Sequence, residues 1–96
     1  LAAVASEVDV IYQTRIQRER FGDRIQDYEQ ARGKYIIDRR ILDKMTADAI
    51  VMHPLPRVDE INAEEVDPDP RAAYFRQAQN GLYVRMALLR MILAAR

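Results

Sequence analysis

The sequence predicts an α/β fold, part of a doubly wound parallel-sheet domain that ends in two C-terminal helices. Residues 8–12 and 49–52 are short runs of mostly apolar, β-prone residues. Runs that are apolar on both faces are typical of buried parallel strands. A capped helix is predicted between the two runs, and apolar residues continue at helical spacing toward the end of the chain.

The helix between the two strands is predicted to begin after Asp38, a residue type that favours the N-cap position. Ile41, Leu42 and Met45 follow at helical spacing and should face the core. Residues 35–37, just before the cap, are expected to be extended. Strand, helix and strand in succession are typical of a parallel crossover unit.

The last part of the chain is predicted as a polar connection over residues 57–69 followed by two helices. Asp69-Pro70 pairs an N-cap with a proline at the first helical position, so the first helix should run over residues 70–78. Asn80-Gly81 is expected to break or kink it. A second, very apolar helix should then cover residues 82–95.

The composition is that of a folded segment without net charge. The chain has 96 residues, one small domain or part of one, and 49% of them are apolar. The 15 basic and 15 acidic residues balance, so neither nucleic acid nor an anionic membrane is expected as a partner. The absence of cysteine excludes disulfides and thiolate metal sites.

No apolar run approaches the roughly 20 residues that are needed to span a bilayer, and no signal peptide is visible. We therefore expect a cytoplasmic protein. The chain begins at Leu1 rather than at a methionine, so we expect the natural N-terminus to lie upstream. An organelle stays open, because any targeting segment would lie there too.

Two polar segments follow the predicted strands and should line one crevice if the strands are neighbours. Residues 14–17 follow the first strand, and residues 53–57 follow the second. In open α/β sheets, ligands bind in the crevice beyond the carboxyl ends of the strands.

The first segment is rich in arginine. Arg15, Arg18 and Arg20 lie within six residues, with Gln17 and Glu19 among them. Guanidinium groups form planar forks that hold carboxylates or phosphates by two bonds each. An anionic ligand is one interpretation of this segment. A solvated charged loop is the other, and it is the commoner outcome for a run of charges.

The second segment is a proline-rich loop. Pro54 and Pro56 flank Leu55 and remove backbone donors, so carbonyls are left to accept hydrogen bonds from a ligand's amino group. A strand terminator with structural prolines is an equally good interpretation. His53 is the only histidine, and a lone polar residue at a strand end is more often structural than catalytic. We expect no metal, no cofactor and no covalent catalysis.

Three stretches together resemble aspartate carbamoyltransferases. They are DVIYQTRIQRERF at residues 9–21, VMHPLPRVDEI at 51–61 and VDPDPRAAYFRQAQNGLYVRMALL at 66–89. The sister family, the ornithine carbamoyltransferases, typically has a cysteine where this chain has Pro54. The resemblance implies transfer of a carbamoyl group from carbamoyl phosphate to L-aspartate. The products would be N-carbamoyl-L-aspartate and phosphate, in de novo pyrimidine biosynthesis.

The resemblance also implies roles for the residues of the two polar segments. Arg15 should hold the side-chain carboxylate of aspartate, and Gln17 should help to orient the same substrate. The carbonyls of Pro54 and Leu55 should accept hydrogen bonds from the amino group of carbamoyl phosphate. The peptide bond between Leu55 and Pro56 should be cis.

Four further residues should support the loop and the closure of the domains, again by resemblance. Glu19 should brace Arg15. Arg20 should bridge to a glutamate in the other domain when the enzyme closes. Tyr28 and Asp59 should belong to the mobile loop's own contacts.

By the same resemblance, residues 1–96 are the C-terminal part of the aspartate-binding domain. The N-terminal carbamoyl-phosphate domain, with its Ser-Thr-Arg-Thr phosphate loop and its catalytic histidine, is absent from this sequence. This fragment alone is therefore predicted to be inactive. The family works as a homotrimeric catalytic subunit, and association with regulatory chains stays open. Two rivals also stay open: a carbamoyltransferase with another amine acceptor, and a non-catalytic homologue.

Overall fold

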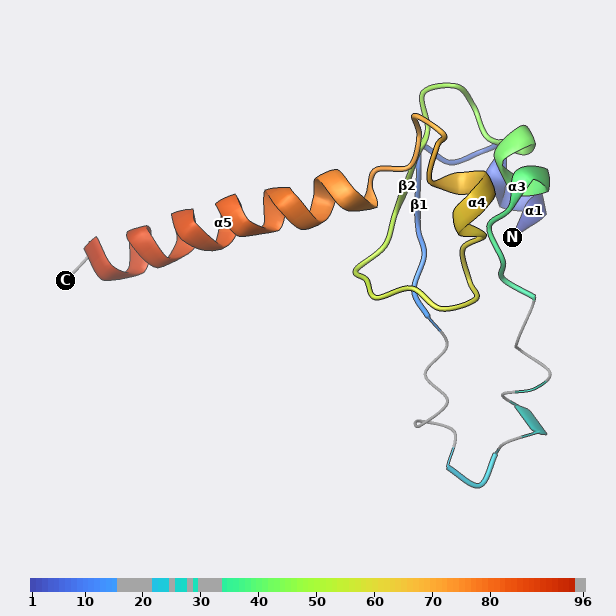
Figure 1. Ribbon diagram of the computed structural model, residues 1–96, viewed down its shortest axis with the longest axis horizontal. Coiled ribbons are helices and arrows are strands. Elements are labelled where there is room, and N and C mark those ends of the chain that lie inside the picture. The colour runs from blue at the N-terminus through green and yellow to red at the C-terminus, as the bar shows by residue number, and fades with distance from the viewer. Residues whose placement is uncertain (16–21, 25, 28, 30–33, 95–96) are drawn as a thin grey trace.

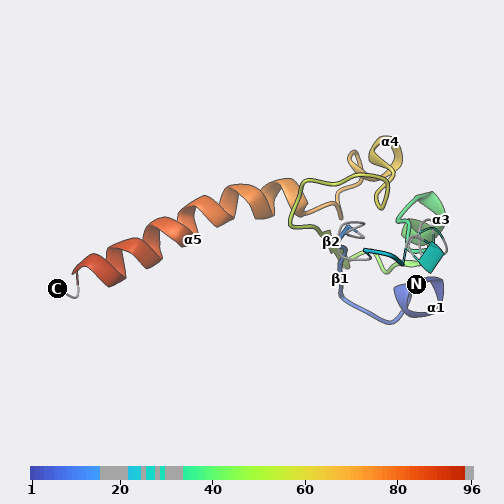
Figure 2. The ribbon, with the colours of Figure 1, turned by 90° about the horizontal axis from the view of Figure 1, so that it is seen from below.

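The computed structural model describes residues 1–15, 22–24, 26, 27, 29 and 34–94 of the chain. A small α/β body holds both strands and the short helices, and one long helix projects from it (Figures 1 and 2). The α/β class and the parallel sheet are confirmed. The elements are α1 (Ala2–Ala5), β1 (Val10–Tyr12), α3 (Arg39–Lys44), β2 (Ile50–Met52), α4 (Ala63–Val66) and α5 (Tyr74–Ala94).

Strands β1 and β2 pair in parallel, with Ile11 opposite Val51. Both central side chains are buried in the core, as the apolar runs predict. The neighbouring side chains of β1, Val10 and Tyr12, are about half exposed. The expectation that β1 is buried on both faces is therefore wrong within the described part of the chain, because the packed side chains cover only one face of this strand.

The helix after Asp38 forms as predicted. The Asp38 carboxylate accepts hydrogen bonds from the backbone N–H groups of Arg40 and Ile41, at 3.0 and 3.3 Å. These bonds satisfy two of the amide groups that a helix start leaves without a partner. Ile41 and Leu42 turn into the core from one face of α3, and Met45, the residue after the helix, is buried beside them.

The extended segment before α3 pairs with a later part of the chain. The Ile37 amide donates to the Glu60 carbonyl, and the Asn62 amide donates to the Ile37 carbonyl, both at 2.9 Å. Ile37 and Ile61 thus form a parallel bridge outside the two-stranded sheet. The connection over residues 57–69 is tied to the body at this point.

Helix α4 lies inside the segment that was expected to be only a polar connection. Asn62 is its N-cap, and the Asn62 side chain accepts a hydrogen bond from the Glu65 amide. An N-cap residue followed three positions later by glutamate is the sequence pattern of a capping box. That pattern was present and would have predicted this helix.

The predicted start of this helix at Asp69-Pro70 is wrong, although residues 74–78 are helical as expected. Residues 71–73 are instead extended along β2: the Val51 amide donates to the Arg71 carbonyl, and the Ala73 amide donates to the Val51 carbonyl, both at 2.8 Å. These two bonds satisfy both backbone groups of Val51, which is fully buried. Leaving such groups without partners would cost more than a local helix cap gains.

The prediction of two C-terminal helices is also wrong, because α5 is a single helix of 21 residues from Tyr74 to Ala94. It runs through Asn80-Gly81 without a break. Glycine inside a helix costs about 1 kcal/mol relative to alanine. The strong helix formers on both sides, including Ala78, Leu82 and Met86, offset that cost.

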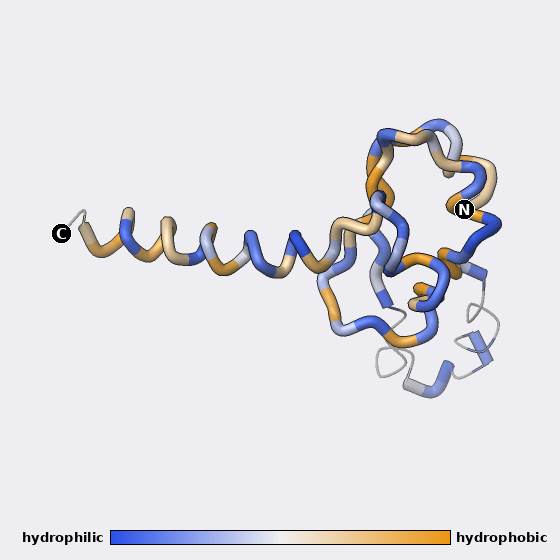
Figure 3. The backbone as a smooth tube through the Cα atoms, turned by 45° about the horizontal axis from the view of Figure 1, so that its top comes forward, coloured by the Kyte–Doolittle hydropathy of each residue, from blue (hydrophilic) through white to orange (hydrophobic). Residues whose placement is uncertain are grey.

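Helix α5 is the most exposed element of the described chain. Tyr74, its first residue, is its one buried side chain. Figure 3 shows apolar residues along the projecting part of the helix. No helix among the described residues is long and apolar enough to cross a membrane. The exposed large apolar side chains of α5 are Phe75, Leu82, Tyr83, Val84, Met86, Leu88, Leu89, Met91, Ile92 and Leu93.

Candidate functional site

A cavity of about 350 Å³ lies at the carboxyl ends of the two strands. It is lined by residues from both polar segments that follow the strands: Thr14, Arg15, His53, Pro54, Leu55 and Pro56. The prediction that the two segments line one crevice is therefore confirmed. The position agrees with the general place of ligands in open parallel sheets.

Backbone pairing brings the two segments together. The register of the strands sets Tyr12 opposite Met52, and the Gln13 amide then donates to the Met52 carbonyl at 2.9 Å. The next residues on either side, Thr14 and His53, consequently leave the sheet side by side and enter the cavity wall.

Gln13 also ties the site to two other loops. Its side chain is buried, and Nε2 donates to the carbonyl of Glu60 at 3.2 Å and to the carbonyl of Tyr35. The side-chain amide of Gln13 thus joins the end of β1 to Glu60, just beyond the proline-rich loop, and to the segment before α3. Gln13 has no signal in the sequence, because both of its partners are distant along the chain.

The proline-rich loop has an unusual backbone. The Leu55-Pro56 peptide bond is cis, as the resemblance led us to expect, and Leu55 has a φ of 53°. A positive φ places Leu55 in the left-handed region, which is uncommon for a residue with a Cβ atom.

His53 and Glu60 form a buried pair behind this loop. His53 is 2% exposed and Glu60 is 8% exposed, and 2.6 Å separates Nε2 of the imidazole from Oε1 of the carboxylate. The other ring nitrogen, Nδ1, accepts a hydrogen bond from the Leu55 amide at 2.7 Å. A backbone amide can only donate, so the ring proton is assigned to Nε2, which donates to Glu60.

The remaining polar atoms of this pair are also engaged. The His53 amide donates to Oε1 of Gln77 on α5 at 2.9 Å. Both carboxylate oxygens of Glu60 lie within hydrogen-bond distance of the Val58 amide, at 3.2 and 3.1 Å. The geometry supports a structural interpretation of His53. The sequence does not mark Glu60 as a partner of His53, since a spacing of seven residues within a loop follows no helix or strand periodicity.

The structure describes four of the eight residues that the resemblance singles out. Arg15, Pro54 and Leu55 line the cavity, whereas Asp59 is exposed and is not among its lining residues. Their roles toward a ligand stay predictions. The other four lie outside the described residues: Gln17, Glu19, Arg20 and Tyr28.

A second cavity, of about 370 Å³, adjoins the first on the side of α5. His53 and Pro54 line both cavities. Within the described ranges, no three His, Asp or Glu side chains gather where they could hold a metal ion. The other residues of the second cavity are Tyr12, Gln77, Ala78, Gly81 and Arg85.

Comparison with known families gives one match that covers almost the whole chain. Residues 1–92 match the family described as "Aspartate/ornithine carbamoyltransferase, Asp/Orn binding domain". The chain belongs to this carbamoyltransferase family. The family resemblance seen in the sequence motifs is thereby confirmed.

Individual carbamoyltransferases are similar over the same region. The chloroplastic aspartate carbamoyltransferase of rice is 66% identical over 96 residues, which are 100% of this chain and 26% of that protein. Aspartate transcarbamoylase from Trypanosoma cruzi in complex with carbamoyl phosphate has a TM-score of 0.82 at 44% identity. A complex of that enzyme with carbamoyl phosphate and aspartate has a TM-score of 0.81 at 42% identity. Each match covers 93% of this chain and 28% of the solved chain.

These relatives are much longer than this chain. The chain spans about a quarter of the length of the rice carbamoyltransferase, with 26% of it covered. The comparison therefore concerns one portion of a carbamoyltransferase, the portion that carries the cavity described above.

Proposed function

We propose that this chain is the aspartate-binding portion of an aspartate carbamoyltransferase. The reaction transfers the carbamoyl group of carbamoyl phosphate to L-aspartate, giving N-carbamoyl-L-aspartate and phosphate in de novo pyrimidine biosynthesis. The observation that carries the proposal is the cavity that joins Arg15 to the Pro54-Leu55 loop at the carboxyl ends of the strands. Family membership and the two ligands named for the Trypanosoma cruzi enzyme support it.

The residues of the cavity suit the chemistry of this transfer. The Arg15 guanidinium would bind the side-chain carboxylate of aspartate as a two-bond fork. The carbonyls of Pro54 and Leu55 would accept hydrogen bonds from the amino group of carbamoyl phosphate. The aspartate amine would then attack the carbamoyl carbon, and phosphate would leave. The main contribution of this portion to catalysis would be to align the two anionic substrates.

Aspartate is favoured over ornithine as the acceptor. A fork of positive charge suits a substrate whose side chain ends in a carboxylate, whereas ornithine ends in an ammonium group. Pro54 also stands where the ornithine enzymes typically have a cysteine. By family resemblance, we also propose that Gln17 helps to orient aspartate and that Glu19, Arg20, Tyr28 and Asp59 have supporting roles.

The rest of the active site would come from other parts of the enzyme. We propose that residues 1–96 belong to the C-terminal part of the aspartate-binding domain and that a separate domain supplies the phosphate loop and the catalytic histidine. A homotrimeric catalytic subunit is proposed, with regulatory chains as a further candidate. The chloroplastic rice relative makes an organelle a candidate location beside the cytoplasm.

The experiment is an assay of the full-length protein that carries this chain. With carbamoyl phosphate present, we expect carbamoyl aspartate from aspartate and no product above background from ornithine. Product from ornithine alone would contradict the proposed acceptor. No product from either amine, with the protein folded, would favour a non-catalytic homologue.

A further inference from the structure

We propose that the buried pair His53 and Glu60 is a positioning device for the carbamoyl phosphate site, acting through the backbone amide of Leu55. This inference rests on the proposed function, because it concerns the loop whose carbonyls would hold the carbamoyl group. The polar side-chain atoms of both residues already have partners within the protein, so the pair is inferred to act through the loop.

The device acts on a backbone conformation that a leucine does not adopt readily. Leu55 lies in the left-handed region, with a φ of 53°. Residues held in sparsely populated regions persist only where their surroundings determine them, and they are frequent at ligand sites. Leu55 lies between Pro54 and Pro56, neither of which has an N–H. The Leu55 amide is thus the one backbone donor within this three-residue turn.

That single donor is held by His53. The distance from the Leu55 amide nitrogen to Nδ1 is 2.7 Å, and the imidazole is 2% exposed. His53 is fixed at two further points: its backbone amide donates to Oε1 of Gln77 on α5, and Nε2 of its ring bonds Glu60. A side chain fixed in this way holds the Leu55 peptide plane, and the carbonyl of Pro54 belongs to that plane.

Glu60 selects the form of the ring that can accept this bond. Its carboxylate accepts a hydrogen bond from the Nε2–H group at 2.6 Å, so Nδ1 keeps a lone pair for the Leu55 amide. The same carboxylate accepts from the Val58 amide, which closes the loop on its other side. The backbone carbonyl of Glu60 receives bonds from Gln13 and Ile37, so the pair is anchored to the sheet region.

Two matched pairs of variants separate positioning from mere stability. In His53→Asn, the Asn side-chain oxygen can still accept from the amide two residues later, as in Asx turns, whereas His53→Leu has no acceptor. Glu60→Gln keeps an oxygen for the Nε2 proton, whereas Glu60→Leu does not. All four are made in the full-length enzyme and assayed with each substrate varied while the other is saturating.

We expect the two leucine variants to raise the KM for carbamoyl phosphate by about ten- to a hundredfold, since a buried amide or ring N–H loses its partner. The asparagine and glutamine variants should stay within about fivefold of wild type. The KM for aspartate should change less than about threefold in all four, because the proposed aspartate-binding residue, Arg15, belongs to the other segment of the cavity wall. A loss of folded enzyme would instead lower kcat without moving either KM. Glu64→Gln, on the exposed face of α4, is the control and should leave both constants unchanged.

Several results would overturn the inference. One is that the two variants of the same residue have equal KM values for carbamoyl phosphate. Another is that the KM values for both substrates rise in parallel. If His53→Leu does not fold, His53→Asn decides by itself: a tenfold rise in its carbamoyl phosphate KM would refute the role of the Nδ1 acceptor. An inactive wild-type enzyme would contradict the proposed function. The comparison of variants requires an active wild-type enzyme, so it tests only the role of His53 and Glu60.

Discussion

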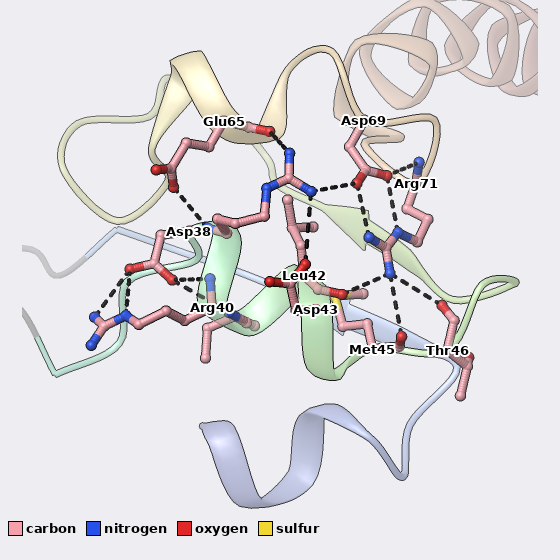
Figure 4. A network of polar contacts seen from close by, with 11 residues as sticks. Asp38, Arg40, Leu42, Asp43, Met45, Thr46, Glu65, Asp69 and Arg71 are labelled. Atoms are coloured by element: carbon pink, nitrogen blue, oxygen red, sulfur yellow. Dashed lines mark hydrogen bonds and ion pairs between the residues drawn. The ribbon is translucent and has the colours of Figure 1, made fainter.

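Arg71 donates from Nη1 to the carbonyl oxygen of Leu42 at 2.8 Å, so a residue from the connection before α5 closes the C-terminal end of α3. The same guanidinium lies 3.3 Å from the Met45 carbonyl oxygen and is held by Asp69 through its Nη2 at 2.8 Å (Figure 4). Positive charge is favourable where a helix leaves carbonyls without partners. The Arg71 backbone meanwhile pairs with Val51 of β2. One residue therefore fixes α3 against the sheet from which the site is built.

Replacing Arg71 by methionine should loosen this junction. The change leaves the carboxylate of Asp69, whose side chain is 8% exposed, without its main partner. Breaking a buried pair on one side costs about 3–5 kcal/mol, and we expect a loss of about 2–4 kcal/mol here because Arg39 also lies 3.8 Å from Asp69. Native-state hydrogen exchange at the Val51 amide, which donates to the Arg71 carbonyl, measures the loss locally.

Arg40→Met is the matched control for this change. Arg40 also pairs with an aspartate, Asp38, at 3.1 Å, but its side chain is 87% exposed. Exposed ion pairs contribute about 0–1 kcal/mol. An Arg71→Met protein as stable as Arg40→Met would contradict a structural role for the Arg71 junction.

The pair of Arg71 and Asp69 also predicts how the free energy of unfolding responds to acid. Hydrogen bonds from Arg71 hold the pKa of Asp69 at about 2, below its ordinary 3.8, and outweigh burial, which acts in the opposite direction. A carboxyl group whose pKa is lower in the folded state stabilises the protein at any pH above its unfolded-state pKa. That stabilisation is lost as the pH falls from about 4 toward 2. The contribution is about 2 kcal/mol. Asp69→Asn should be less stable than wild type at pH 7 and should converge with it near pH 2 in urea unfolding. A constant gap across this range would contradict the assignment.

The fold could be predicted where its signals are local. The cap at Asp38 and the apolar runs around Ile11 and Val51 act within a few residues, and the structure has the helix and both strands there. The extended course of residues 71–73 could not be predicted in that way. It depends on the edge of a strand about twenty residues earlier, and the local Asp69-Pro70 pattern favours a different structure.

Gly81 offers a direct test of the continuous α5. Because the helix does not break there, Gly81→Ala should stabilise it by about 0.5–1 kcal/mol. The new Cβ would lie 3.2 Å from Nη1 of Arg85, the mobile end of a long side chain that can move aside. Gly22→Ala should instead destabilise the protein, because Gly22 has a φ of 54°, which alanine adopts only with strain. Thermal unfolding of the two variants compares them, and a Gly81→Ala protein less stable than wild type would point to a break in solution.

The site was predictable only in outline. Parallel strands end at one edge, so the meeting of Arg15 with the Pro54-Leu55 loop followed from the strand pattern. The buried supports could not be inferred, because Gln13 reaches the Glu60 carbonyl across 47 residues and no periodicity marks such a contact. Residues that contact a ligand leave motifs in a sequence more readily than residues that hold those motifs in place.

The Arg15 side chain gives the most direct test of substrate recognition. In the full-length enzyme, Arg15→Ala should lower kcat/KM for aspartate by roughly two or more orders of magnitude, because a charged hydrogen-bonding partner is lost. Arg15→Lys should also be poor, since an ammonium group cannot form the planar fork. Steady-state kinetics with aspartate varied measures both. Near-normal kcat/KM in Arg15→Ala would remove this residue from the site.

The last prediction concerns the exposed surface of α5. Large apolar side chains from Leu82 to Leu93 are each more than half exposed, for example Met91 at 69% and Ile92 at 61%. They lie on successive turns and reach most of the way round the helix, whereas soluble monomers rarely expose apolar patches of more than a few hundred Å². The projecting position of the helix leaves this surface uncovered by the described residues (Figure 1).

We therefore expect the isolated 96-residue chain to self-associate and to form no carbamoyl aspartate, because the surface is available for association and the phosphate-binding half of the proposed site lies elsewhere. Light scattering and the binding of an apolar dye measure the first property, and an activity assay measures the second. Replacing Leu89 and Ile92 by lysine should reduce both scattering and dye binding, since charge interrupts the apolar surface. Arg90→Lys, a change on the same turn that keeps the charge, is the matched control and should leave association as it is. A stable wild-type monomer that binds no dye would contradict the expected self-association.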